Sequence, residues 1–188
     1  TWGNNAFVFF NSLRDPAGRL AAIFTSNGDR IGYSPEFGPL ADTAAGDFYA
    51  VAPDGRFAFH YDPSGSVNEY FQAGMSGTAV PAADPHDPAI NAKIVSVFYG
   101  VNWLHDFFYQ AGYTEPAGNP QMDNLGRGGV DCDPLIVHAG FSTTFTTTSA
   151  EGVSPVIDLG RARRSASRRD ASVDFTTLAH EWGHTMVG

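Results

Sequence analysis

The stretch Asp87–Gly112, DPAINAKIVSVFYGVNWLHDFFYQAG, carries the clearest structural signal in the chain. Asp87 is a good N-cap, and Pro88 suits the first helical position, where no N–H is needed. Gly112 can end a helix with a positive φ. Apolar residues recur between these ends at steps of three or four, namely Ile90, Ile94, Phe98, Val101, Phe108 and Ala111. The spacing predicts a long helix over residues 88–112.

On the N-terminal side, short apolar runs alternate with turn residues, which predicts a β-rich segment over residues 1–70. The expected strands are AFVFF (Ala6–Phe10), LAAIF (Leu20–Phe24) and RFAFHY (Arg56–Tyr61). Residues 71–87 contain Gly, Pro, Ala and Ser without periodicity, and we expect a loop there.

On the C-terminal side, residues 113–170 read as loops with an edge strand in DPLIVHAGF (Asp133–Phe141). The Thr-rich segment that follows, FSTTFTTTS, favours extended structure because its side chains are β-branched. A second helix is expected over residues 171–188, beginning near Ser172, whose hydroxyl can cap it. The sequence therefore predicts an α+β fold.

The charge of the chain argues against two classes of partner. The formal net charge is -9 and the only lysine is Lys93, whereas nucleic acids and anionic membrane surfaces attract clustered positive charge. The basic run Arg161–Arg169 lacks aromatic residues for base stacking, so we expect an exposed loop, with a polyanion contact as the alternative. Cys132 is the only cysteine, which excludes a disulfide within these residues.

The expected C-terminal helix contains the most informative chemistry, LAHEWGH. His180 and His184 are four residues apart, so both imidazoles lie on one helix face and can share a metal ion. Glu181 can then act as general base toward a water bound to that metal. Gly183 would let another segment pack closely beside the second histidine. The alternative is a pair of surface histidines without a function.

Several segments together resemble one family. They are TWGNNAF (Thr1–Phe7), FAFHYDP (Phe57–Pro63), VFYGVNWLHDFFYQAGYTEPAGNPQ (Val97–Gln121), NLGRGG (Asn124–Gly129) and RRDASVDFTTLAHEWGH (Arg168–His184). On these segments the chain resembles the fungalysin-type metalloendopeptidases, which belong to the thermolysin-like zinc peptidases. The block Val97–Gln121 is the most specific of them, because metal binding alone would not create it.

The resemblance implies a thermolysin-like zincin fold, with residues 1–188 as the β-rich N-terminal lobe ending on the zinc helix. It implies that His180 and His184 are Zn²⁺ ligands and that Glu181 is the catalytic carboxylate. It also implies secretion, a propeptide that is removed, and protein or peptide substrates. The family's third zinc ligand is a glutamate on a later helix, which this sequence does not contain, and Ser142, Thr143 and Thr144 replace an Asn/Ala-rich substrate-binding stretch.

Other polar residues are weighed against structural roles. We expect His105 and Asp106 to form a buried structural pair, or else to tune the metal site, and His60 and His138 to be structural histidines. Any of these three histidines could in principle supply the missing ligand. A Gly-rich loop carries Asp123, Asn124, Asp131 and Asp133, whose spacing fits no EF-hand but whose oxygens could bind Ca²⁺.

The sequence thus favours a secreted zinc endopeptidase that uses metal-activated water and a glutamate base. The rival interpretation is a catalytically incomplete fragment, or a peptidase-derived binding module, that lacks the third zinc ligand.

Overall fold

The computed structural model describes residues 1–10, 41, 46–61, 83–141, 144–160 and 170–187. In these residues it contains one four-stranded sheet, two α-helices and two short 3-10 helices. In chain order the elements are β1 (Ala6–Phe10), α2 (Pro88–Gln110), η2 (Glu115–Ala117), β2 (Leu135–Phe141), β3 (Phe145–Thr147), β4 (Val156–Gly160), η3 (Ala171–Val173) and α3 (Phe175–Val187). The mixed α+β class expected from the sequence is confirmed.

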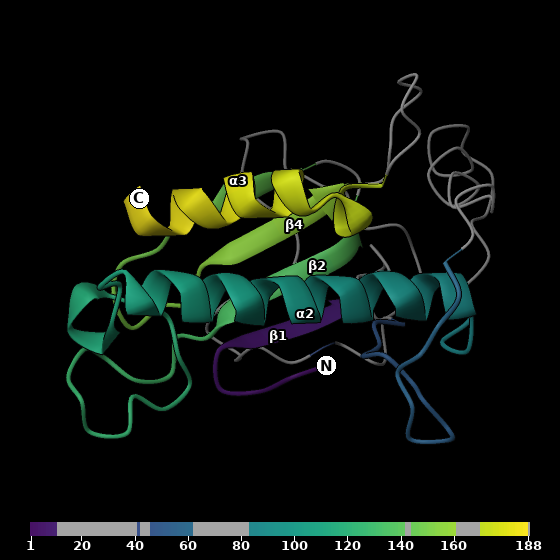
Figure 1. Ribbon diagram of the computed structural model, residues 1–188, viewed down its shortest axis with the longest axis horizontal. Coiled ribbons are helices and arrows are strands. Elements are labelled where there is room, and N and C mark those ends of the chain that lie inside the picture. The colour runs from purple at the N-terminus through teal and green to yellow at the C-terminus, as the bar shows by residue number, and fades with distance from the viewer. Residues whose placement is uncertain (11–40, 42–45, 62–82, 142–143, 161–169, 188) are drawn as a thin grey trace.

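The sheet has the order β1-β2-β4-β3, with β1, β2 and β4 parallel and β3 antiparallel to β4 at the edge. Every residue of β1 and β4 is buried, as expected for parallel strands that are covered on both faces. Figure 1 shows α2 and α3 lying side by side along the sheet and running in the same direction.

The main core lies between these helices and one face of the sheet. Alternate strand residues such as Val8, Val137 and Ile157 pack there against Ile94 and Val97 of α2 and Trp182 of α3. A smaller cluster on the other sheet face is formed by Phe9, Ile136 and Val156.

The helix α2 follows its sequence signals closely. The Asp87 carboxylate accepts hydrogen bonds from the N–H groups of Ala89 (2.8 Å) and Ile90 (3.4 Å). The helix ends at Gln110, two residues before the expected boundary, and Gly112 adopts a φ of 106° just beyond it. Capping and termination are local, so they could be predicted.

The second helix begins later than residue 171. The N–H groups of Thr176 and Thr177, in its first turn, donate to the Asp174 carboxylate and not to the Ser172 hydroxyl. Ser172 instead lies in η3, whose own cap is Asp170. The Asp170–Asp174 segment therefore forms a 3-10 turn before the helix α3 (Phe175–Val187), and our expected start was wrong.

Two expectations about strands need correction. The segment Arg56–Tyr61 alternates apolar and polar residues but forms no strand, and its Phe57 is 51% exposed. The described part of residues 113–170 contains three strands, with β2 in the interior of the sheet rather than at its edge. The described part of residues 1–70 contains one strand, β1, and the β-rich character of the whole segment stays a prediction because much of it lies outside the described residues.

Other expectations have mixed outcomes. The Thr-rich stretch does form a strand, β3. Residues 83–87 precede α2 without regular structure, as a loop there requires. The remainder of the expected 71–87 loop, the strand Leu20–Phe24 and the basic run Arg161–Arg169 lie outside the described residues.

Candidate functional site

The helix α3 carries two histidines on its exposed surface. Their Nε2 atoms are 3.2 Å apart, and the two rings meet edge to face at 87°. Both side chains are exposed, and the contact with each other is the one that the structure records for either ring. The i, i+4 spacing of His180 and His184 therefore brings the two ring nitrogens to a common point, as the sequence predicted.

This arrangement fits two ligands of one metal ion. Two imidazole nitrogens, each about 2.0–2.1 Å from a tetrahedral Zn²⁺, would be separated by about 3.3–3.4 Å, close to the observed spacing of 3.2 Å. Among the described residues, however, no group of three or more His, Cys, Asp or Glu side chains is gathered closely enough to hold a metal. The described part of the protein thus offers two candidate ligands, His180 and His184.

Glu181 lies between the two histidines in sequence but faces the protein, where it is only 7% exposed. Its Oε2 atom accepts a hydrogen bond of 2.7 Å from the hydroxyl of Thr146 in β3. The same hydroxyl lies 3.0 Å from the main-chain carbonyl oxygen of Glu181. The edge strand therefore contacts the carboxylate that the sequence identified as the candidate base.

The buried face of α3 fixes the helix against α2 and the sheet. Leu178 and Trp182 are 3% and 0% exposed. The helices approach so closely at Gly100 that a Cβ there would lie 2.6 Å from Leu178 Cδ2. At Gly183, by contrast, a Cβ would meet nothing within 4 Å in the described structure, so our expectation of a closely packed neighbour at that glycine was wrong.

Two polar contacts hold the two ends of α3. Before it, Asp170 forms a buried ion pair of 2.9 Å with Lys93 of α2. Near its end, the Tyr113 hydroxyl lies 3.3 Å from the carbonyl oxygen of Thr185 and donates more closely to that of Gly118, at 2.7 Å. Burial, with the nearby charges of Glu151 and Asp133, raises the pKa of Tyr113 to about 12, so its hydroxyl remains a donor.

The other histidines do not join His180 and His184. His60 is exposed, in a segment without regular structure. His138 is buried on the sheet face opposite the helices, with its Nδ1 atom 2.6 Å from Asp158 and its ring against Phe9. His138 is therefore a structural histidine, as expected.

His105 is committed to a chain of hydrogen bonds. The Asn4 amide donates to Gln121 Oε1, and Gln121 Nε2 lies 3.0 Å from His105 Nε2. Because an amide nitrogen only donates, His105 Nε2 accepts and its Nδ1–H donates to Asp106, 3.0 Å away. The hydrogen bond of the expected pair is present, but the pair is not buried as expected, because Asp106 is exposed.

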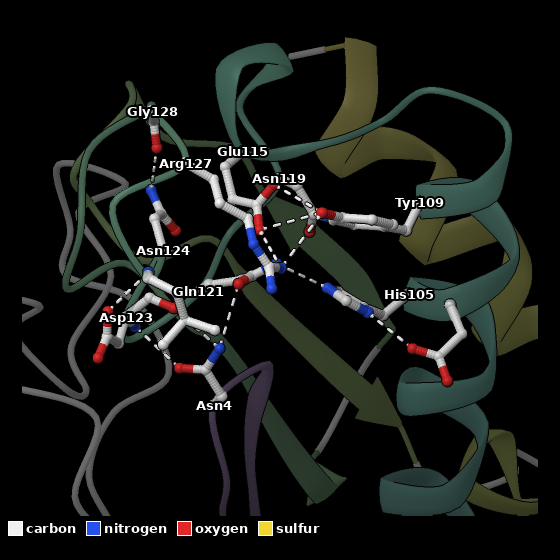
Figure 2. Close-up of polar contacts among 12 residues, drawn as sticks. Asn4, His105, Tyr109, Glu115, Asn119, Gln121, Asp123, Asn124, Arg127 and Gly128 are labelled. Carbon is white, nitrogen blue, oxygen red and sulfur yellow. Dashed lines mark hydrogen bonds and ion pairs between the residues drawn. The ribbon is translucent and has the colours of Figure 1, made fainter.

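The ring of His105 stacks on that of Tyr109, with centroids 5.7 Å apart, and Tyr109 belongs to a second hydrogen-bonded group with Glu115 and Arg127. Figure 2 shows both groups, which we together call the Glu115 network and define as Asn4, His105, Tyr109, Glu115, Gln121 and Arg127. Glu115 is 1% exposed and accepts hydrogen bonds from the Tyr109 hydroxyl (2.9 Å) and from Arg127 (3.2 Å). Burial alone would raise the pKa of Glu115, but hydrogen bonds from its own N–H, Tyr109 and Arg127, with the charge of Arg127, hold that pKa below its usual value.

The aspartates that we considered as calcium ligands form hydrogen bonds to main-chain N–H groups in and around the Gly-rich loop. Asp123 accepts from the N–H of Leu125 (2.7 Å), and Asp131 accepts from that of Asn124 (2.5 Å). The two oxygens of Asp133 accept from Gln121 and Gly152, each at 3.0 Å. Burial raises the pKa of Asp133, and the charge of Glu151 adds to this rise. These carboxylates thus act as acceptors for main-chain N–H groups rather than converging on one point.

Sequence reasoning missed Thr146 as a partner of Glu181. The Thr-rich stretch predicted a strand, but the register of β3 against β4 decides which threonine faces α3. Thr146 pairs with Ile157, whose side chain belongs to the core under the helices, so Thr146 faces the helices as well. The sequence indicates that alternate residues of this strand face opposite sides of the sheet. Which residues face α3 follows only from the pairing of β3 with β4.

Comparisons with known proteins show the family of the chain. A family model described as Fungalysin metallopeptidase (M36) matches residues 40–187. An extracellular metalloproteinase of Aspergillus niger is 31% identical over 149 residues, which cover 73% of this chain and 24% of that protein. An extracellular metalloproteinase of Pyricularia oryzae is 26% identical over 98% of this chain and 29% of its own length. The chain thus spans less than a third of the curated relatives it matches, and no helix in its described part is long and apolar enough to cross a membrane.

Proposed function

Because the chain belongs to the fungalysin (M36) metallopeptidase family, we propose that it forms the metal-bearing part of a secreted zinc endopeptidase. The family implies a metal and peptide substrates. The observation that carries the proposal is the pair of imidazole nitrogens 3.2 Å apart beside a buried glutamate. We further propose that residues 1–188 form the N-terminal lobe of a thermolysin-like zincin.

His180 and His184 would hold the zinc ion through their Nε2 atoms, and a third ligand would come from outside the described residues. When bound, zinc polarises a peptide carbonyl and acidifies a water molecule. The Tyr113 and Lys93–Asp170 contacts keep the helix that presents both histidines against the rest of the fold. Such support restricts the positions of the ring nitrogens.

Glu181 would act as general base and then as general acid. As the water oxygen bonds to the peptide carbonyl carbon, the water proton passes to the Glu181 carboxylate. When the C–N bond breaks, Glu181 delivers this proton to the leaving nitrogen and becomes a carboxylate again. Burial of Glu181 limits its contact with bulk water, so the proton stays at the site.

The test is metal analysis of the full-length protein with single histidine substitutions. We expect about one zinc per chain, lost in both His180→Ala and His184→Ala because each variant removes one of the three protein ligands that a catalytic zinc site needs. His86→Ala is the matched control, since this histidine is exposed and lies in the turn before α2, and its zinc content should not change. Unchanged zinc in both site variants would remove the proposed metal centre.

The absence of a group of three ligands among the described residues favours one alternative, a peptidase-derived binding module without catalysis. Zinc binding and peptidase assays separate the two functions. The enzyme should cleave casein, lose activity on chelation and regain it with zinc. A full-length protein that binds peptides but never cleaves them would support the binding module.

The relatives are named extracellular, and we propose the same location and a removable propeptide for the full-length protein. A secreted form whose N-terminus is shorter than that encoded by the gene would support both proposals.

A further inference from the structure

The contact between Thr146 and Glu181 joins two elements that are 35 residues apart in sequence. Thr146 lies in the short edge strand β3, and Glu181 lies in α3. The hydroxyl is 2.7 Å from Glu181 Oε2 and 3.0 Å from the Glu181 carbonyl oxygen. A hydroxyl has one proton, so it donates fully to one of these two acceptors at a time.

The shorter contact is typical of a hydroxyl that donates to an ionised carboxylate, which is a charge-assisted bond. Such a bond restricts rotation of the Glu181 carboxyl and occupies Oε2. Proton transfer from water then falls to Oε1. The side chain is only 7% exposed, so water can replace the Thr146 hydroxyl poorly if that hydroxyl is lost.

The second acceptor gives the hydroxyl a further contact. The Glu181 carbonyl oxygen is 3.0 Å from the same hydroxyl, so Thr146 lies against both the side chain and the main chain of Glu181. The edge strand β3 and the helix α3 are therefore tied together at the carboxyl itself.

We propose that Thr146 is a positioning residue for Glu181, whose hydroxyl holds the Glu181 carboxyl in one orientation. This inference rests on the proposed peptidase function, because it assigns to Glu181 the proton transfer described above. Thr146 itself contacts neither the substrate nor a metal ligand in this proposal.

The test compares Thr146→Val, which keeps the branched shape but removes the hydroxyl, with Thr146→Ser, which keeps the hydroxyl. In full-length protein, we expect Thr146→Val to lower kcat by roughly 10- to 100-fold, as for the loss of one hydrogen bond to a charged group. KM, zinc content and Tm should change little. Thr146→Ser should retain kcat within about threefold.

A double variant that combines Thr146→Val with Glu181→Gln shows whether Thr146 acts through the glutamate. If it does, adding Thr146→Val to Glu181→Gln should cause no further loss of activity. A readout without turnover uses zinc-free protein labelled with ¹³C at glutamate carboxyls. The Glu181 resonance, identified by its absence in Glu181→Gln, should shift in Thr146→Val and remain in place in Thr146→Ser.

The outcomes distinguish a failure of the proposed peptidase function from a failure of the positioning role of Thr146 alone. Near-normal activity of Glu181→Gln would overturn the proposed function itself. A strong defect in Glu181→Gln together with normal kcat in Thr146→Val would overturn only the positioning role. Loss of zinc, a large fall in Tm or a rise in KM alone in Thr146→Val would also overturn it, because each indicates a structural or substrate contact instead.

Discussion

Two polar regions of this protein use their hydrogen-bonding groups in opposite ways. In the Glu115 network, the carboxylate of Glu115 accepts from Tyr109 and Arg127, and Gln121 bonds with Asn4 on one side and His105 on the other. On α3, His180 and His184 face solvent, and within the described part of the chain each has the other as its one polar side-chain contact. The polar groups of the first region stabilise the fold, while those of the second remain available for the metal ion that we propose.

This difference explains why two histidines from similar sequence contexts serve different purposes. His105 lies on α2 next to an acidic residue, and His180 lies on α3 next to another. His105 is buried with both ring nitrogens engaged, whereas His180 is exposed. The neighbouring residue in the sequence therefore does not separate the two histidines, whereas their free hydrogen-bonding capacity in the structure does.

The largest expected effect comes from exchanging glutamate for glutamine in each region of the full-length protein. Glu181→Gln should lower kcat/KM by roughly two to four orders of magnitude, because glutamine cannot accept the proton, while stability changes little. Glu115→Gln is the matched control: it should retain the activity of the folded protein but unfold at lower denaturant concentration. Peptidase assays and urea titrations of both variants test this. Equal activities in the two variants would abolish the distinction between the regions.

A smaller effect is expected from replacing glycines in the loop Asn124–Gly129, which lies beside Glu115. Gly129 has a φ of 70°, and a Cβ there would lie 2.3 Å from the carbonyl oxygen of Glu115. Gly129→Ala should therefore cost about 2–4 kcal/mol in the free energy of unfolding, combining backbone strain with a clash.

Gly126→Ala is the control for backbone strain alone, because Gly126 has a φ of 71° but no atom within 4 Å of its Cβ position. It should cost about 1–2 kcal/mol. Urea unfolding monitored by circular dichroism measures both variants. Equal losses would mean that the close approach to Glu115 contributes nothing.

The smallest expected effect is a pH dependence in the same network. Because the folded-state pKa of Glu115 is lowered from 4.5, its ionised form contributes stability that is fully present above pH 4.5 and lost as the pH falls through the lower folded value. The stability difference between wild type and Glu115→Gln should therefore be constant near neutrality and shrink below pH 4.5. Urea midpoints measured from neutral to acidic pH provide the test. A difference that stays constant to acidic pH would contradict the role assigned to the Glu115 charge.

Features encoded by neighbouring residues could be predicted from the sequence. The Asp87 cap, the apolar spacing of α2 and the glycine beyond it lie within one segment, and the separation of His180 and His184 follows from helix geometry. The strand β2 was recognised from its apolar run, but its central place was not, because that depends on β1 and β4 on either side.

Contacts between distant segments could not be predicted. Asn4 and Gln121 are 117 residues apart, and Lys93 and Asp170 are 77 apart. The strand β4 was overlooked because Asp158 interrupts its apolar run, and only the structure shows that this carboxylate pairs with His138 inside the protein. Thr146, the partner of Glu181, could not be predicted either, because the two residues are 35 positions apart in sequence.

The parallel pairing of β1 with β2 has a consequence for the folding rate of the molecule. Ala6 pairs with Leu135, so these two strands meet only after more than a hundred intervening residues have been made. Closing so long a loop is entropically costly, and topologies dominated by such contacts fold slowly. We therefore expect the pairing of β1 with β2 to form late, after the contacts between residues that are close in sequence.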